Sequence, residues 1–296
     1  MDDSIALAER FERHRPRLRA VAYRMLGSLA EADDAVQDTW MRLSGRDPQR
    51  IDNLGGWLTT VVARECLHVL RSRRRRREDL SALRLPDPVV IPDGDLDPEQ
   101  KAMLTDSVGL ALLVVLDRLT PTERLAFVLH DMFEVPFEEI ATIVGRSPTA
   151  TRQLASRARR RVDGAGIPPP PPDLARQRQV VGAFFAAARS GNFDALVEVL
   201  APDVVLRADV GGRGLSVVRG VPGVAELARA PLTARLHPAL VNGTVGTVVT
   251  LSGRPFSIMA FVVVDTRIVE IYGIRDPDRV HRVAAAVLAH RAAASG

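Results

Sequence analysis

The sequence predicts two all-α domains followed by an α+β cone. A length of 296 residues is enough for two or three domains, at roughly 100–200 residues each. Proline-rich linkers at 85–98 and 164–173 divide the chain into segments 1–84, 99–163 and 174–296. Helical periodicity dominates the first two segments, and β-branched runs enter only in the third.

The composition limits the class of protein. With 46% hydrophobic residues the chain can build ordinary cores, so wholesale disorder is excluded. No apolar run reaches the roughly 18 residues of a membrane span, and the N-terminal residues lack the apolar stretch of a secretory signal. The single cysteine, Cys66, excludes a disulfide framework and a cysteine-rich zinc module. We therefore expect a cytoplasmic protein with no metal site and no cofactor.

The charges are arranged in blocks. Lys101 is the only lysine, so arginine carries nearly all the positive charge and can form forked contacts with phosphates and guanines. Residues 25–41 contain four acids and no basic residue, whereas 71–77 and 146–161 each contain six arginines. This pattern predicts at least two partner surfaces and a polyanion that is bound at two places. The alternative, that each arginine cluster is a solvated helix end, remains open.

Segment 1–84 is predicted to be helical. In residues 30–43 apolar side chains recur every three or four positions with acids between them, which gives one apolar and one acidic face. Residues 57–77 predict a second long helix, whose C-terminal half is almost pure arginine and suits the negative end of the helix dipole. Residues 47–56 are expected to form the loop before it.

Segment 99–163 predicts a helix-turn-helix. Thr120 to Glu123 has the pattern of a capping box, which opens a helix. Residues 136–144 predict a short helix that ends at Gly145, and Ser147 with the following proline opens a third. This acid-free third helix is expected to read the major groove of DNA. The alternative is a helical hairpin that contacts nothing.

Segment 174–296 predicts the cone. Residues 175–201 form two helices broken at 190–192, and helices are also expected at 220–230 and 278–294. β-Branched runs predict a curved antiparallel sheet. Its expected strands are 204–207, 215–219, 245–251, 256–264 and 268–274. No regular element is expected in the linker 85–98, because prolines interrupt it. The five prolines of the second linker favour a stiff, extended spacer.

Two long motifs resemble the extracytoplasmic-function (ECF) sigma factors. HRPRLRAVAYRMLGSLAEADDAVQDTWMRL followed by GGWLTTVVARECLHVLRSRRRRRE is similar to their region 2. LDRLTPTERLAFVLHDMFEVPFEEIATIVGRSPTATRQLASRARRRV is similar to region 4, in the expected order and separation. The third segment, with RSGNFDALVEVLAPDVVLRAD, resembles the SnoaL-like, NTF2-like extension that some actinobacterial members carry.

The resemblance implies an alternative sigma factor that directs transcription initiation at promoters. Its acidic helix would dock on the coiled coil of the large subunit of core RNA polymerase, with an aromatic anchor beside fixed carboxylates. The implied contacts are Asp33, Asp34, Val36, Gln37, Asp38, Trp40 and Met41. An alternative for Trp40 alone is a place in the core. The polymerase does the chemistry, so no catalytic residue is expected.

The resemblance also implies two promoter contacts. Region 2 would open the −10 element and capture a flipped base, with polar side chains reading it and arginines holding the backbone. The candidates are Asn53, Thr59, Thr60, Arg64, Arg71, Arg73, Arg74 and Arg75. The recognition helix would read the −35 element, with Arg152 and Gln153 suited to base edges and Arg157 and Arg160 to phosphates. The full set is Arg146, Ser147, Thr149, Thr151, Arg152, Gln153, Ser156, Arg157 and Arg160.

A regulatory contact between the first linker and the cone is also implied. The family shows a linker motif close to Trp-Leu-Pro-Glu-Pro and, in the cone, glycine-rich and Asn-Pro-Asp motifs; this chain carries altered forms of all three, with Arg84 in place of the tryptophan. The corresponding residues are Leu85, Pro86, Asp87, Pro88, Asp209, Gly211, Gly212, Arg213, Asp276, Pro277 and Asp278. The cone would then regulate activity in cis, in place of a separate anti-sigma protein.

Two other functions remain open. The chain could be a free-standing, ligand-responsive helix-turn-helix regulator, or a SnoaL-like isomerase or cyclase tethered to a DNA-binding module. Aromatic side chains could line a pocket in the cone, although core packing explains them equally well. We expect no convergent acid–base pair around His237.

The expected partners are core RNA polymerase and promoter DNA at the −35 and −10 elements, without a membrane. Whether the cone binds a small ligand stays open. The free chain is expected to be monomeric.

Overall fold

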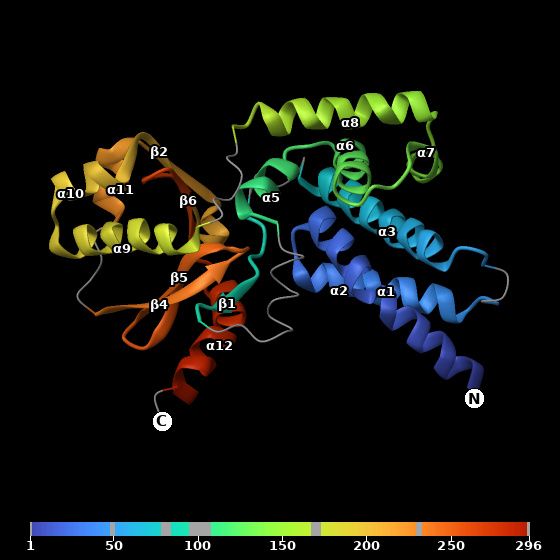
Figure 1. Cartoon of the computed structure of the whole chain (residues 1–296), viewed down its shortest axis with the longest axis horizontal. Coiled ribbons are helices and arrows are strands. Elements are labelled where there is room, and N and C mark those ends of the chain that lie inside the picture. Colours follow the sequence, from blue (N-terminus) through green and yellow to red (C-terminus); the bar gives the residue numbers. More distant parts are fainter. Residues whose placement is uncertain are drawn as a thin grey trace. The chain divides into compact units, whose positions relative to one another are not determined.

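The computed structural model describes residues 2–47, 51–77, 84–94, 108–166, 173–228 and 233–294. The chain divides into two compact units, shown in Figure 1. The helical unit comprises Met1–Leu80 and Leu112–Ile167, and the cone unit comprises Ser81–Ala111 and Pro168–Gly296. Residues 81–111, which include the first linker, therefore belong with the cone.

Three long helices form the first part of the helical unit. They are α1 (Asp2–Leu26), α2 (Leu29–Ser44) and α3 (Leu54–Arg77). The apolar face predicted for residues 30–43 is the buried face of α2, where Ala32, Ala35 and Leu43 enter the core. Because α3 begins at Leu54, the expected loop at 47–56 is shorter than predicted; residues 48–50 lie outside the described residues.

Shorter helices complete the helical unit. α5 (Leu110–Leu116) leads into α6 (Pro121–Phe127), which continues as a π-helical turn at Val128–Met132. The predicted capping box is present: Glu123 N donates to Thr120 Oγ1 at 3.3 Å and Thr120 N donates to Glu123 Oε2 at 3.1 Å. α7 (Phe137–Val144) and α8 (Pro148–Asp163) follow (Figure 1).

A seven-stranded sheet forms the cone unit, in the order β1-β4-β5-β6-β7-β2-β3. Its strands are β1 (Val90–Pro92), β2 (Leu200–Asp209), β3 (Leu215–Arg219), β4 (Ala234–Val241), β5 (Thr244–Leu251), β6 (Arg254–Val264) and β7 (Arg267–Ile274). The prediction of an antiparallel sheet was wrong at one pair, because β2 lies parallel to β7 with Leu206 opposite Ile271. Sequence periodicity does not encode the direction of a neighbouring strand.

Two strands of the cone unit were missed. β1 lies in the linker 85–98, where no regular element was expected, and it pairs with β4 through Ile91 and Leu240. Its prolines do not prevent this pairing, because Pro88 precedes the strand and Pro92 ends it, on the edge of the sheet where proline is tolerated. β4 itself contains His237 and Pro238, which weakened its strand signal.

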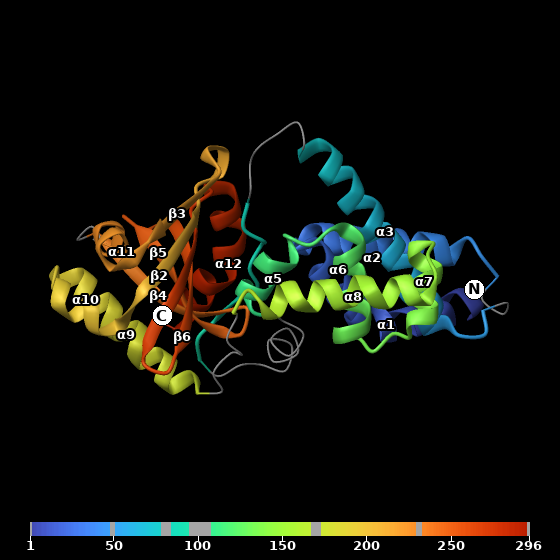
Figure 2. The same ribbon diagram turned by 90° about the horizontal axis from the view of Figure 1, so that it is seen from above.

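Helices cover both faces of the sheet. α9 (Leu174–Ser190), α10 (Phe193–Val199) and α11 (Gly220–Ala228) share an apolar core with one face, in which Phe184 and Phe261 meet edge to face at 5.6 Å. α12 (Pro277–Ala294) packs on the other face, as Figure 2 shows. In the described parts of the chain, no helix has the length and apolar content needed to cross a bilayer.

Candidate polymerase, promoter and linker interfaces

The outer face of α2 presents the predicted acidic surface. Asp34, Gln37 and Asp38 are exposed, and Met41 beside them is 57% exposed. Asp33 is also exposed and accepts a bidentate contact from Arg19 at 2.6 and 3.1 Å. Val36 is only 1% exposed, so it supports the helix from the core and does not form part of this surface.

Trp40 is partly in the core and partly at the surface, so it fits both the core and the interface alternatives. Its ring is half-buried and lies 5.0 Å from the ring of Phe11, at an interplanar angle of 55°. The packing against Phe11 of α1 fixes the indole, and part of its surface stays exposed. Trp40 is therefore a rigid, partly exposed aromatic group next to carboxylates, which is the arrangement expected of an interface anchor.

The candidates for the −10 element divide into helix-forming and exposed groups. Asn53 caps α3, since its Oδ1 accepts from Gly56 N at 3.0 Å. Thr59 is buried and its hydroxyl donates to Gly55 O at 2.8 Å, so contact with a base would require this side chain to be released, and its role stays a prediction. Thr60 is half-buried, and Arg64 is exposed one turn further along.

The arginines at the end of α3 are not equivalent. Arg71, Arg74 and Arg75 are exposed and suited to contact phosphates. Arg73 is folded back onto the protein, because it donates to Leu26 O at 2.8 Å and forms an ion pair with Glu31. A phosphate would have to compete with these contacts for Arg73.

The predicted helix-turn-helix is built by α7 and α8. Gly145 ends α7 in the left-handed region, with φ 73° and ψ 43°, and its N–H donates to Ala141 O at 2.9 Å. Ser147 caps α8 by accepting from Ala150 N at 3.2 Å. The left-handed turn favours glycine, and together with the serine cap it fixes the entry into α8.

One face of α8 is buried and the other is free for a partner. Leu154, Ala155 and Ala158 pack inward. Thr151 is also fully buried and donates to Ser147 O at 3.0 Å, so it is not on the exposed face of α8, and its role as a DNA contact stays a prediction. The exposed candidates are Arg146, Ser147, Thr149, Arg152, Gln153, Ser156, Arg157 and Arg160.

Arg152 is pre-positioned on this surface. Its guanidinium lies 3.0 Å from Glu138 Oε1 and 5.5 Å from the centre of the Phe137 ring. Both partners belong to α7, so they link the first helix of the motif to the reading face of the second. This contact limits the rotamers of Arg152 and aims it along the exposed face.

The linker motif and the cone motifs meet around a residue that the sequence reasoning missed. Arg279 donates to Asp87 Oδ1 at 2.7 Å, to Asp209 Oδ2 at 2.6 Å and to Leu85 O at 2.7 Å. Leu85 N in turn donates to Asp209 Oδ2 at 3.0 Å. A signal was present, because two acidic motifs that approach each other need a cation, and Arg279 directly follows one of them.

The glycine-rich and Asp-Pro-Asp motifs hold this arrangement in place. Gly211 has φ 70° and donates to Asp209 Oδ1 at 3.0 Å, and a Cβ added to it would lie 2.9 Å from Asp276 Oδ2. Asp276 caps α12 by accepting from Arg279 N at 3.1 Å. Gly212 and Asp278 are exposed. The side chain of Arg213 lies outside the described residues.

Asn242 forms a second fastening of the same segment. Its Oδ1 accepts from Val89 N at 3.1 Å, and its Nδ2 donates to Val108 O at 2.8 Å. Asn242 is buried in the turn between β4 and β5, with φ 51°. The sequence showed no signal for this role, since a turn asparagine is ordinarily explained by its own backbone.

His237 lies on β4 of the cone. Its Nε2 lies 3.0 Å from Thr250 Oγ1, while Asp203 and Asp265 are exposed. Tyr272 contacts Glu270, and burial raises the pKa of its phenol.

A separate cavity of about 420 Å³ lies between α9 and the β4–β5 pair, with Val181, Phe185 and Leu236 in its wall. Among the described residues, no group of three or more His, Cys, Asp or Glu could hold a metal ion.

Comparisons with known proteins agree with these features. The family model for sigma-70 region 2 matches residues 10–76, and the model for sigma-70 region 4 matches residues 109–162. The ECF RNA polymerase sigma factor SigJ of Mycobacterium tuberculosis is 38% identical over 293 residues, which cover 91% of each chain. The probable ECF RNA polymerase sigma factor SigI of the same species is 37% identical over 84% of this chain and 82% of its own. A crystal structure of SigJ matches with a TM-score of 0.72 at 35% identity, over 92% of this chain and 97% of that one.

The two matched regions, in this order, define a transcription initiation factor of the sigma-70 type. The chain belongs to the ECF sigma factors of RNA polymerase. The predicted fold class, two helical parts followed by an α+β cone, and the resemblance on which the predicted function rested are thereby confirmed.

Proposed function

We propose that this sigma factor binds core RNA polymerase through the exposed face of α2 and recognises promoter DNA through α3 and α8. The α2 surface consists of Asp33, Asp34, Gln37, Asp38, Trp40 and Met41. A half-buried aromatic ring among exposed carboxylates suits a basic, partly apolar partner surface. A free-standing DNA-binding regulator has no need of such a surface.

The observation that carries the promoter assignment is the charge of the exposed face of α8. This helix has no acid between Pro148 and Val162, and its exposed side carries Arg152, Gln153, Arg157 and Arg160. Such a face attracts the DNA backbone, while the arginine and amide side chains near its start suit base edges. On α3, we assign Arg64, Arg71, Arg74 and Arg75 to the backbone near the −10 element.

We further propose that the cone regulates promoter engagement in cis. Residues 85–92 belong to the connection between the two DNA-binding regions, and Arg279, Asn242 and β4 fix them to the cone. Fixing part of a connection shortens the length that can move freely. Release of the contact would therefore increase the separations that regions 2 and 4 can reach.

We propose that the cone acts by binding and not by catalysis. Its 420 Å³ cavity falls within the roughly 300–1,000 Å³ of small-molecule pockets, and a small ligand there is one regulatory input that we consider. The free chain is proposed to be a monomer that acts where the polymerase is, in the cytoplasm. Turnover of a substrate by the isolated chain would contradict the non-catalytic assignment.

In-vitro transcription with core polymerase tests the main assignment. The full-length chain should open its promoter only when core polymerase is present, whereas a free-standing regulator would bind DNA tightly alone. Asp34→Arg and Asp38→Arg should each weaken co-migration with core polymerase. Glu9→Arg makes the same charge change at an exposed position of α1 and serves as the matched control. Equal co-migration of all three variants with core polymerase would refute the assignment to α2.

A further inference from the structure

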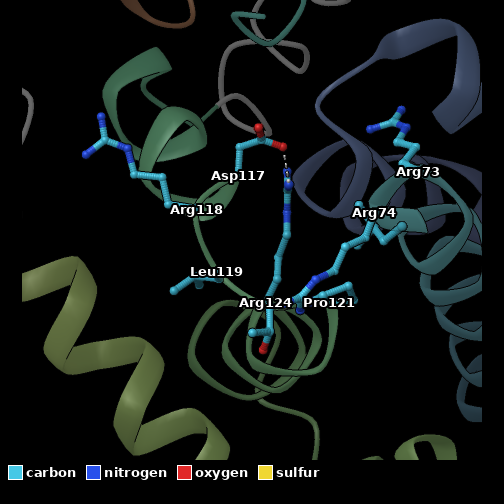
Figure 3. Close-up of a pocket in the computed structure, with 9 residues that line it drawn as sticks. Arg73, Arg74, Asp117, Arg118, Leu119, Pro121 and Arg124 are labelled. Atoms are coloured by element: carbon cyan, nitrogen blue, oxygen red, sulfur yellow. Dashed lines mark hydrogen bonds and ion pairs between the residues drawn. The ribbon is translucent and has the colours of Figure 1, made fainter. Parts of the chain in front are cut away.

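A cavity in the helical unit gathers arginine side chains from segments far apart in the sequence. It measures about 260 Å³ and lies between the end of α3 and residues 117–124. Its charged walls are Arg73 and Arg74 on one side and Asp117, Arg118 and Arg124 on the other. Figure 3 shows Arg124 running from α6 toward Asp117, with Arg74 reaching toward the same space.

The charges in this cavity are unbalanced. Four arginines and one carboxylate line this small volume, although the guanidinium of Arg118 points away from Asp117 in Figure 3. Arg73 has a second counter-ion in Glu31, but Arg74 and Arg118 are exposed and form no ion pair with other described residues. The cavity therefore has a positive potential that a bound anion would reduce.

Arg124 gives the second and independent indication of a ligand. Its side chain is only 2% exposed. Nε donates to Arg24 O at 3.0 Å and Nη1 to Asp117 Oδ1 at 3.3 Å, but Nη2 has no hydrogen-bond partner within the described residues. A buried donor without a partner is costly, and a ligand oxygen in the cavity would satisfy it.

The electrostatic state of Arg124 agrees with this. Burial lowers the pKa of its guanidinium to about 10, an effect that Asp117 opposes and the nearby Arg73 reinforces. The side chain remains charged at neutral pH. It is thus a buried cation with one carboxylate and one carbonyl as acceptors, and it retains capacity for another.

We propose that this cavity binds a small phosphate anion, either a free phosphate or pyrophosphate or the phosphate chain of a nucleotide. Arginine forks match the oxygen spacing of phosphate and make bidentate, charge-assisted contacts. The volume is below the roughly 300–1,000 Å³ of pockets that enclose drug-sized ligands, so it suits the phosphate groups and not a whole nucleotide. The base and sugar of a nucleotide would remain outside.

A bound anion would also favour the arrangement of helices that forms the cavity. One wall belongs to the segment matched by sigma-70 region 2 and the other to the segment matched by region 4. An anion that contacts both walls binds only while they are together, so it stabilises that state by mass action. Promoter engagement that separates the two walls would be opposed by the anion.

Calorimetric titration of the full-length chain tests the site. Inorganic pyrophosphate and ADP are titrated in turn at one ionic strength set with potassium chloride, and saturable one-to-one binding of at least one of them is expected. The double variant R74Q/R118Q, which changes two exposed side chains, should raise the dissociation constant about 10- to 100-fold, as expected for loss of charge-assisted contacts. R13Q removes an exposed arginine from α1 outside the cavity and should leave binding unchanged.

The comparison of ligands separates the two sources of phosphate. Equal affinities would indicate a site for free pyrophosphate, and tighter binding of ADP would indicate the phosphate chain of a nucleotide. As a second readout, pyrophosphate should raise the melting temperature of the parent chain and of R13Q but not of R74Q/R118Q. The proposal is overturned if neither ligand binds saturably or if R13Q weakens binding as much as the double variant does. It is also overturned if the double variant binds both anions as the parent chain does and is impaired only in binding promoter DNA.

Discussion

Arg279 Nη1 lies 2.6 Å from Asp209 Oδ2, in a position where the carboxylate is completely buried. The two residues are 70 positions apart, on α12 and at the end of β2. Asp209 also accepts from the backbone N–H groups of Leu85 and Gly211. A single carboxylate therefore connects the linker motif and the glycine-rich motif to α12.

Arg279→Met should destabilise the cone strongly. The substitution leaves Asp209 buried without its cation, a change that typically costs about 3–5 kcal/mol in the free energy of unfolding. Urea unfolding followed by circular dichroism measures the loss. Arg282→Met changes an exposed arginine on the same helix and should stay within about 0.5 kcal/mol of the parent chain. Equal unfolding midpoints for the two variants would show that the ion pair contributes little.

Gly211→Ala should destabilise the same region through the backbone. The residue has φ 70°, and the added Cβ would lie 2.9 Å from Asp276 Oδ2. A cost of about 1–3 kcal/mol in the free energy of unfolding is expected from the left-handed conformation alone. Gly212→Ala is the matched control, because nothing lies within 4 Å of its added Cβ. A thermal melt in which both variants unfold together would contradict this account.

Two substitutions on α8 should separate phosphate contact from base contact. Arg157→Ala should weaken promoter binding uniformly across sequences and reduce the salt slope by about 1. Gln153→Ala should relax specificity at one position of the −35 element with little change in the salt slope. Binding of the polymerase complex to a set of single-base promoter variants, at several salt concentrations, measures both. Arg157→Ala would contradict its assignment if it changed the preference for one base and left the salt slope intact.

Cys66 should react with thiol reagents only when the helical unit opens. Cys66 belongs to α3 and its thiol is buried, and this burial raises the pKa of the thiol to about 12. At pH 8.5 the folded chain should therefore resist alkylation, whereas the chain in urea should be labelled rapidly. Mass spectrometry of samples taken over time gives both rates. Rapid labelling of the folded chain would show that Cys66 is accessible.

The same shift predicts the direction of a pH effect on stability. The thiol ionises more readily in the unfolded chain, so the contribution of Cys66 is fully present below the unfolded pKa of about 8.5. It decreases as the pH rises toward the folded value of about 12. Cys66→Ala should lose this part of the pH dependence, even though the smaller side chain lowers overall stability.

Local signals in the sequence were sufficient for much of the helical unit. The capping box at Thr120, the left-handed Gly145 and the cap at Ser147 are read from neighbouring residues, and each occurs in the structure. The burial of Thr59 and Thr151, which the sequence did not indicate, has one physical basis. Each hydroxyl donates to the backbone carbonyl four residues earlier. The hydrogen-bonding capacity that suggested a DNA contact is thus used within the helix itself.

Long-range relationships account for what the sequence could not predict. The parallel pairing of β2 with β7, the strand formed by Val90–Pro92 and the place of Arg279 all depend on residues more than 60 positions away. Periodicity and composition describe one segment at a time. The acidic linker motif indicated that a contact exists, but its cationic partner became visible only in the fold.

The position of β1 at the rim of the sheet has a further consequence for the chain. Val90–Pro92 protects the outer edge of β4, whose backbone groups would otherwise be open to another strand. Any signal that pulls the linker away from the cone also exposes this edge. A chain whose linker has left the cone would therefore be more prone to associate with another copy through β4 than a chain whose linker is in place.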